Sequence, residues 1–216
     1  MWEDIWTVLS NLALLIPMVT AIRYRRVLRA FILPVECFFS AAYHLCDSFD
    51  LCFFSFTTHA NFDFFLAQTL IVLAGFYFID FKFGYEWVEW VLILLSFVGI
   101  AVLQAALPGE FMVQVAITVF VFVIVVGYWI FFHIPNYNWT NVATGVSFMA
   151  ISVVFFNVQN TADPSLYWAI HSLWHVTASV GLDFIFRIKP KAYVWQSAAS
   201  RIRYQPQILG IPIPSA

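Results

Sequence analysis

Two histidines, four residues apart, lie in the apolar stretch AIHSLWHVTASVGLDF, residues 169–184. In a helix this spacing puts His171 and His175 on the same face. A charged side chain inside a membrane span costs roughly 2.5–3.5 kcal/mol, so an ionisable residue there indicates a function. Histidine is also the commonest metal ligand among the side chains. The pair is therefore a candidate part of a metal site.

Polar residues recur in two other apolar stretches. Glu36, Ser40 and His44 are spaced by four in ECFFSAAYHLCD and share one helix face. Asp63 lies at the start of the stretch NFDFFLAQT. Three histidines and a carboxylate are typical of a catalytic zinc site, in which three protein ligands hold the metal and water takes the fourth position. A lone histidine in a span more often makes a helix-to-helix hydrogen bond, so only the whole set favours zinc.

The composition predicts that these residues lie in a membrane protein. The chain has 216 residues, of which 62% are hydrophobic and 10% charged, and its mean hydropathy is +0.86. Soluble domains hold about 25% charged residues, which cover their water-facing surface. We therefore expect an all-α integral membrane protein whose partners are the lipid bilayer and a membrane lipid substrate. The basic C-terminal tail is better suited to the surface of a membrane than to nucleic acid, which we do not expect as a partner.

Apolar stretches of about the length that crosses a bilayer, roughly 17–25 residues, occur seven times. They span residues 5–22, 30–46, 62–79, 87–106, 111–132, 142–158 and 165–186. The connections between them are short. The sequence therefore predicts one seven-helix domain, residues 1–190, followed by a short basic, proline-containing cytoplasmic tail, residues 191–216.

The positive charges predict how this bundle is oriented. Lysine and arginine favour the cytoplasmic side of a membrane, and all ten in this chain follow the first, third or seventh stretch. They are Arg23, Arg25, Arg26, Arg29, Lys82, Arg187, Lys189, Lys191, Arg201 and Arg203. We therefore expect an N-terminus outside or in a lumen and a cytoplasmic C-terminus, in the plasma membrane or in an endomembrane such as the ER or Golgi. The first stretch is not typical of a signal peptide, because its leading segment MWEDIW is acidic.

This topology brings the polar residues to one depth. The second stretch would run outward, whereas the third and the seventh would run inward from the outer surface. His44 and Asp63 would then meet His171 and His175 near the outer leaflet. Four polar residues at a common level strengthen the prediction of a metal site.

Other polar residues are expected to lie apart from that site. Asp183 would be about 12 Å deeper along the helix than the second histidine and would pair with Arg187, four residues later. Glu36 is interpreted as a neutral, hydrogen-bonded carboxyl group. Cys46 and Cys52 either form a disulfide in an oxidising compartment or remain free thiols, and the sequence leaves both alternatives open.

The motifs resemble a known group of membrane proteins. SAAYH in the second stretch, an aspartate at the start of the third and HSLWH in the seventh resemble the CREST superfamily of seven-span metal-dependent hydrolases, which includes alkaline ceramidases and adiponectin-receptor-like proteins. The segments YHLCD, DFFLAQTLIVLAGFYFIDF and YWAIHSLWH are most similar to the branch of myomaker and the post-GPI-attachment lipases. The resemblance extends from the first stretch through the seventh.

The resemblance implies a role for each candidate residue. His44, His171 and His175 would hold Zn²⁺. Asp63 would orient or deprotonate the metal-bound water, and Ser40 would hydrogen-bond that water or the developing oxyanion. Members of the superfamily cleave amide or ester bonds in membrane lipids, or have acquired other tasks such as cell fusion.

Three functions remain as alternatives. The first, which the complete set of residues favours, is a zinc-dependent lipid amide or ester hydrolase. The second is a non-enzymatic membrane-remodelling or cell-fusion protein with a structural metal site. The third is a seven-span receptor, which is the least favoured because the short cytoplasmic loops offer little surface to a signalling partner.

Overall fold

The computed structural model describes residues 2–24, 26–79, 86–107, 111–132, 134–159, 161 and 163–189. Within these residues the chain forms helices and turns without strands, which confirms the all-α prediction. The elements in chain order are α1 (Trp2–Ser10), η1 (Asn11–Leu14), α2 (Leu15–Arg23), α3 (Val27–Phe49), α4 (Phe56–Phe76), α5 (Glu86–Ala106), α6 (Phe111–Phe131), α7 (Trp139–Val158), η2 (Pro164–Leu166) and α8 (Tyr167–Ile185). The predicted tail, residues 191–216, lies outside the described residues, as do five of the positive residues that predict the orientation: Arg25, Lys82, Lys191, Arg201 and Arg203.

Each predicted apolar stretch coincides with a helix if α1, η1 and α2 are counted as one. Five helices of the described chain are long and apolar enough to cross a membrane: Asp4–Arg23, Val27–Phe49, Phe56–Phe76, Trp87–Ala106 and Trp139–Val158. In α6 the corresponding apolar stretch, Val115–Phe131, is shorter, and α8 is not among the five. Large apolar side chains such as Leu94, Phe122 and Val154 are exposed, as contact with lipid requires. These helices indicate an integral membrane protein.

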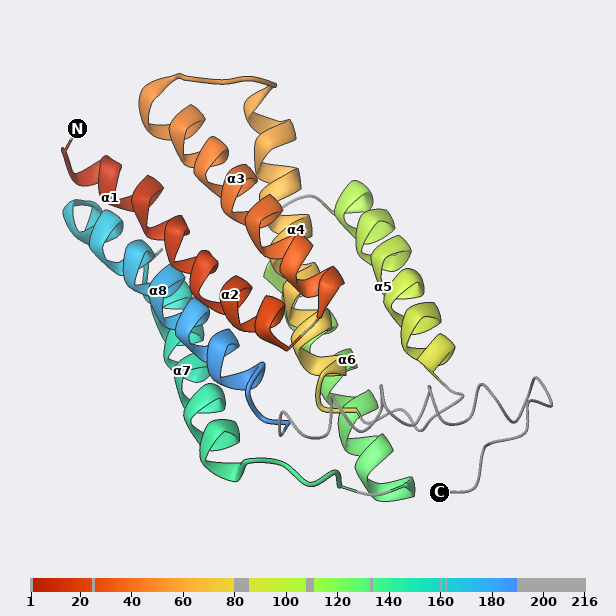
Figure 1. Cartoon of the computed structure of the whole chain (residues 1–216). Coiled ribbons are helices and arrows are strands. Elements are labelled where there is room, and N and C mark those ends of the chain that lie inside the picture. Colours follow the sequence, from red (N-terminus) through yellow and green to blue (C-terminus); the bar gives the residue numbers. More distant parts are fainter. Residues whose placement is uncertain are drawn as a thin grey trace, which may run out of the picture.

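Helices α3 and α8, which carry the three predicted metal-ligating histidines, each pack against several other helices. Helix α8 packs along α7 and also contacts α1, η1 and α2, whereas α3 packs against α4, α2, α1 and η1. Helix α4 reaches further, to α5 and α6. The N-terminus, the α3–α4 loop and the start of α8 lie toward the same end of the bundle (Figure 1). We call this end the disulfide end, because the α3–α4 loop contains the Cys46–Cys52 bond.

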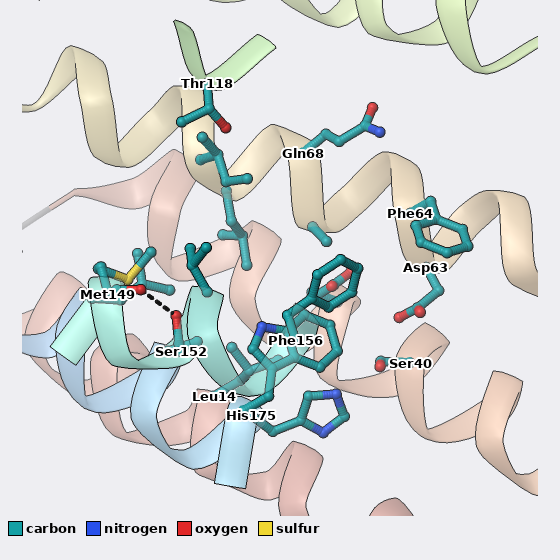
Figure 2. A pocket seen from close by; sticks show the side chains of 18 of the residues that line it. Leu14, Ser40, Asp63, Phe64, Gln68, Thr118, Met149, Ser152, Phe156 and His175 are labelled. Carbon is teal, nitrogen blue, oxygen red and sulfur yellow. Dashed lines mark hydrogen bonds between the residues drawn. The ribbon is translucent and has the colours of Figure 1, made fainter. Parts of the chain in front are cut away.

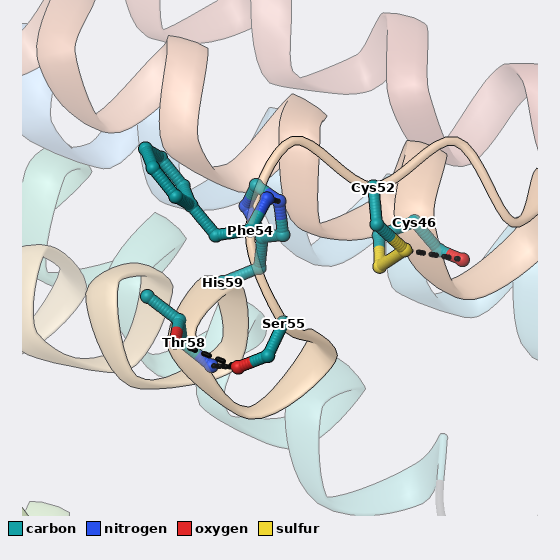
Figure 3. The surroundings of a disulfide bond; sticks show 6 residues. All are labelled: Cys46, Cys52, Phe54, Ser55, Thr58 and His59. Atoms are coloured by element: carbon teal, nitrogen blue, oxygen red, sulfur yellow. Dashed lines mark hydrogen bonds between the residues drawn. A yellow bond between two sulfur atoms is a disulfide. The ribbon is translucent and has the colours of Figure 1, made fainter.

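The disulfide resolves the question that the sequence left open about the two cysteines. Helix α3 ends at Phe49. The next residue, Asp50, adopts the left-handed backbone conformation (φ 56°), and its N–H donates to the Cys46 carbonyl. This tight end turns the chain back, so that Cys52 bonds to Cys46 (Figure 3). Further along the loop, the Phe54 N–H donates to the His59 ring at 3.1 Å. The disulfide and this hydrogen bond fix the connection between α3 and α4.

Helix α4 begins earlier than the apolar pattern predicts. The expected start was residue 62, but the helix starts at Phe56, because the Ser55 hydroxyl caps it by accepting from the Thr58 N–H. The polar segment FTTHAN hides this extra turn and a half from a hydropathy argument. Asp63 therefore lies two turns inside the helix rather than in its first turn.

The opposite end of α8 carries the predicted ion pair. Asp183 forms a salt bridge with Arg187, four residues later, which confirms the expected i, i+4 pair. The Thr20 hydroxyl of α2 also donates to the Asp183 carboxylate. This group ties α8 to α2 at a distance from the histidines.

Two glycines allow α7 and α8 to approach closely. A Cβ at Gly145 of α7 would lie 2.9 Å from Cγ1 of Ile185 and 3.1 Å from the carbonyl oxygen of Gly181 on α8. A Cβ at Gly181 would in turn lie 3.1 Å from the Gly145 carbonyl oxygen. Small residues at such a crossing let helix backbones pack directly in a membrane.

We expect Gly145→Ala to destabilise the protein, because the added methyl group meets backbone atoms that cannot move away cheaply. Overpacking of this kind costs about 1–3 kcal/mol. Gly99→Ala is the matched control, since no atom lies within 4 Å of a Cβ at Gly99. The thermal midpoint of the detergent-purified protein should fall for Gly145→Ala and should not fall for Gly99→Ala. Equal midpoints for the two variants would contradict the close crossing.

Candidate metal centre

Three histidines from two helices meet at the disulfide end of the bundle. His44 lies in the last two turns of α3, and His171 and His175 lie in the first turns of α8. All are buried, with exposed fractions of 1%, 5% and 6%. One candidate ligand nitrogen from each ring lies within 4.8 Å of the other two. The structure thus brings together the three residues that the sequence predicted as metal ligands.

The orientation of the rings is set by contacts on their far sides. Nδ1 of His171 lies 2.6 Å from the Gln159 side-chain oxygen, and Nδ1 of His175 lies 2.9 Å from the Ser10 hydroxyl. An amide oxygen only accepts, so the first contact places the proton of His171 on Nδ1 and leaves a lone pair on Nε2. That Nε2 lies 3.0 Å from Nε2 of His44. Partners on Nδ1 commonly orient metal-ligating histidines in this way.

The donor set fits a zinc ion. Zinc lies about 2.0–2.1 Å from an imidazole nitrogen, so two ligating nitrogens are about 3.4 Å apart in a tetrahedral site and never more than about 4.2 Å apart. The Nε2 atoms of His44 and His171, at 3.0 Å, are already within that limit. The widest separation in the cluster is 4.8 Å or less, so rotations that move a ring by less than about 1 Å bring all three nitrogens into range.

Ser40 and Asp63 lie beside this cluster rather than in it. Ser40 is one turn before His44 on α3, and Asp63 projects from α4. Their side chains point toward one another in Figure 2. Among the described residues the metal-ligand cluster contains the histidines alone, so the position of Asp63 suits contact with a bound water better than contact with the ion.

A cavity of about 270 Å³ opens beside the histidines. His175, Ser40 and Asp63 form part of its wall (Figure 2). Most of the remaining wall is apolar and comes from η1, α4, α6, α7 and α8, with Leu14, Phe64, Leu70, Val115, Met149, Phe156 and Leu182 among the lining residues. Such a lining suits a hydrocarbon chain.

Three polar residues near the site were not predicted from the sequence: Ser10, Asn11 and Gln159. Ser10 and Gln159 orient the histidines, and Asn11 lines the cavity. Each is an uncharged polar residue within or at the end of an apolar stretch. Ser10 and Gln159 are also of residue types that are common in helices, so they do not stand out in the sequence. Their depth in the membrane, matched to that of the histidines, is the signal that could have identified them.

Comparison with known proteins assigns the chain to a family. No curated protein matches it at a significant level. A family described as "Protein of unknown function (DUF3522)" matches residues 1–176, which include the three histidines, Ser40 and Asp63. Because this match extends over most of the chain, the protein is a member of the DUF3522 family.

Proposed function

We propose that this protein is a zinc-dependent hydrolase that cleaves an amide or ester bond in a membrane lipid. The observation that carries the proposal is the position of the histidine cluster, which adjoins an apolar cavity through His175. The histidines offer the ligands that zinc prefers, and the cavity offers an environment for hydrocarbon. The resemblance to the CREST superfamily supports the same reaction.

In this proposal each residue of the site has a separate role in hydrolysis. Zinc in this site would act as a Lewis acid and lower the pKa of a coordinated water. Ser10 and Gln159 hold the rings of His175 and His171 in place, so that little reorganisation is needed. Asp63 accepts the proton of the attacking water, and Ser40 donates a hydrogen bond to the oxygen that gains negative charge.

The proposal includes seven membrane spans with the site near the outer leaflet. Helices α6 and α8 have 21 and 19 residues, which is about 30 Å of helix and enough to cross the hydrocarbon core. The described lysines and arginines, Arg23, Arg26, Arg29, Arg187 and Lys189, follow α2, begin α3 or follow α8. Their positions favour a cytoplasmic location for that end of the bundle. The Cys46–Cys52 disulfide supports an oxidising compartment on the other side.

We expect purified protein to hold one zinc ion per chain and His171→Gln to lose it, because glutamine keeps the polarity of the side chain but is a poor ligand. His59→Gln is the matched control, since His59 is also a buried histidine but lies outside the cluster. Glutamine can still accept the hydrogen bond from Phe54 at that position. Mass spectrometric metal analysis after dialysis measures the difference. Full metal content in His171→Gln would contradict the site.

Asp63→Asn should retain zinc and lose turnover by about 10²–10⁴-fold, the usual contribution of a general acid or base. Asp163→Asn, at an exposed position before α8, should have the activity of the wild-type protein. Release of fatty acid from proteoliposomes that contain defined lipid amides and esters measures the activity. Stoichiometric zinc in a wild-type protein that releases no fatty acid from any of these lipids would overturn catalysis and favour the non-enzymatic alternative.

A further inference from the structure

The wall of the cavity carries buried polar atoms that have no partner. Glu36 and Asn11 both line it, with exposed side-chain fractions of 5% and 0%. The carboxylate oxygen Oε2 of Glu36 and the amide oxygen Oδ1 of Asn11 are buried and make no hydrogen bond within the described chain. The expected hydrogen bond of Glu36 is therefore not made by this oxygen.

The local structure explains why the oxygen of Asn11 remains available. Asn11 starts the 3₁₀ turn between α1 and α2, and its amide nitrogen donates to the carbonyl oxygens of Thr7 at 3.0 Å and Val8 at 3.2 Å. Those contacts use both N–H groups of the amide. The oxygen is thus the atom of this side chain that is left to bind something else.

Some polar groups of the wall have partners, whereas the amide oxygen of Gln68, on α4, also has none within the described chain. The Ser152 hydroxyl of α7 donates to the Met149 carbonyl, and Ser40 faces Asp63 (Figure 2). Buried acceptors without partners are costly in a membrane interior, where no bulk water can satisfy them. A plain hydrocarbon chain in the cavity would leave Glu36 and Asn11 in that condition.

From these contacts we infer that Glu36 and Asn11 form a second subsite, which binds a hydroxyl or a protonated amine on the chain of a lipid ligand. The amide oxygen of Asn11 can only accept, and Glu36 accepts through whichever of its oxygens carries no proton, so the matching ligand group must donate hydrogen bonds. Glu36 lies eight residues before His44 on α3, which is about 12 Å along the helix axis. The donor group therefore belongs in the middle of the ligand chain and not beside the bond that the metal site would cleave.

This inference rests on the proposed role of the cavity as a lipid site, but it requires no catalysis. The test is equilibrium competition against radiolabelled stearic acid on detergent-purified protein treated with a chelator. The competitors are stearic acid, stearic acid with a mid-chain hydroxyl and stearic acid with a mid-chain amine. We expect the better of the two substituted acids to bind about tenfold or more tightly than stearic acid, because it satisfies acceptors that the plain chain leaves unpaired. Which of the two binds more tightly identifies the donor.

Two variants at one position separate hydrogen bonding from shape. Glu36→Gln keeps a side-chain acceptor and should keep the preference, whereas Glu36→Met has a similar length without one and should bring the affinities to within about twofold. The wild-type measurement alone decides the matter if Glu36→Met fails to fold. Equal binding of all three acids by the wild-type protein would overturn the subsite, as expected if water fills this part of the cavity. Binding with the expected preference but without hydrolysis in proteoliposomes would instead reject the proposed catalysis and leave the subsite standing.

Discussion

The contact between His44 and His171 is the constraint on which the rest of the site depends. Their Nε2 atoms lie 3.0 Å apart in the interior of the bundle, where both rings are almost completely buried. Polar rings at this depth are tolerated only when their nitrogens have partners. Helix α7 supplies such a partner to His171 through Gln159, directly after its last turn, and helix α1 supplies one to the neighbouring His175 through Ser10. Four helices must therefore be in register for the cluster to form.

The packing of α7 on α8 helps to meet this requirement. Gly145 and Gly181 bring the two backbones together about four helical turns away from Gln159. Beside this crossing, α8 is also held by the ion pair of Asp183 and Arg187 and by the hydrogen bond from Thr20. Helix α8 is thus fixed at one end by the polar contacts of its histidines and at the other by close backbone contact, the ion pair and the hydrogen bond from Thr20. This arrangement limits the freedom of the two histidines that it carries.

Sequence patterns predicted the parts of this arrangement that depend on periodicity. The spacing of four predicted that His171 and His175 share a face, and the same spacing predicted the pair of Asp183 with Arg187. Apolar stretches of membrane length predicted the helices to within a few residues, except at the start of α4. There the cap made by Ser55 extends the helix through polar residues that hydropathy assigns to a loop.

Contacts between distant segments were harder to predict. Ser10, Asn11 and Gln159 are uncharged polar residues whose own segments give no indication of which helix they will face. Only the three-dimensional packing shows that Ser10 meets His175 and that Asn11 has one satisfied and one unsatisfied end. The state of Cys46 and Cys52 likewise depended on the left-handed turn at Asp50, which the sequence did not specify.

The long separation between the two halves of the cluster has a consequence for biosynthesis. His44 and His171 are 127 residues apart, and α8 is the last helix of the described chain. Because a chain is synthesised from its N-terminus, α3 enters the membrane with its polar face long before α8 exists. Until α8 is made, the polar groups of α3 are exposed to lipid, to the other early helices or to an insertion factor. Completion of the cluster is therefore among the last events of assembly, and it requires that α1, α3, α7 and α8 have reached their final packing.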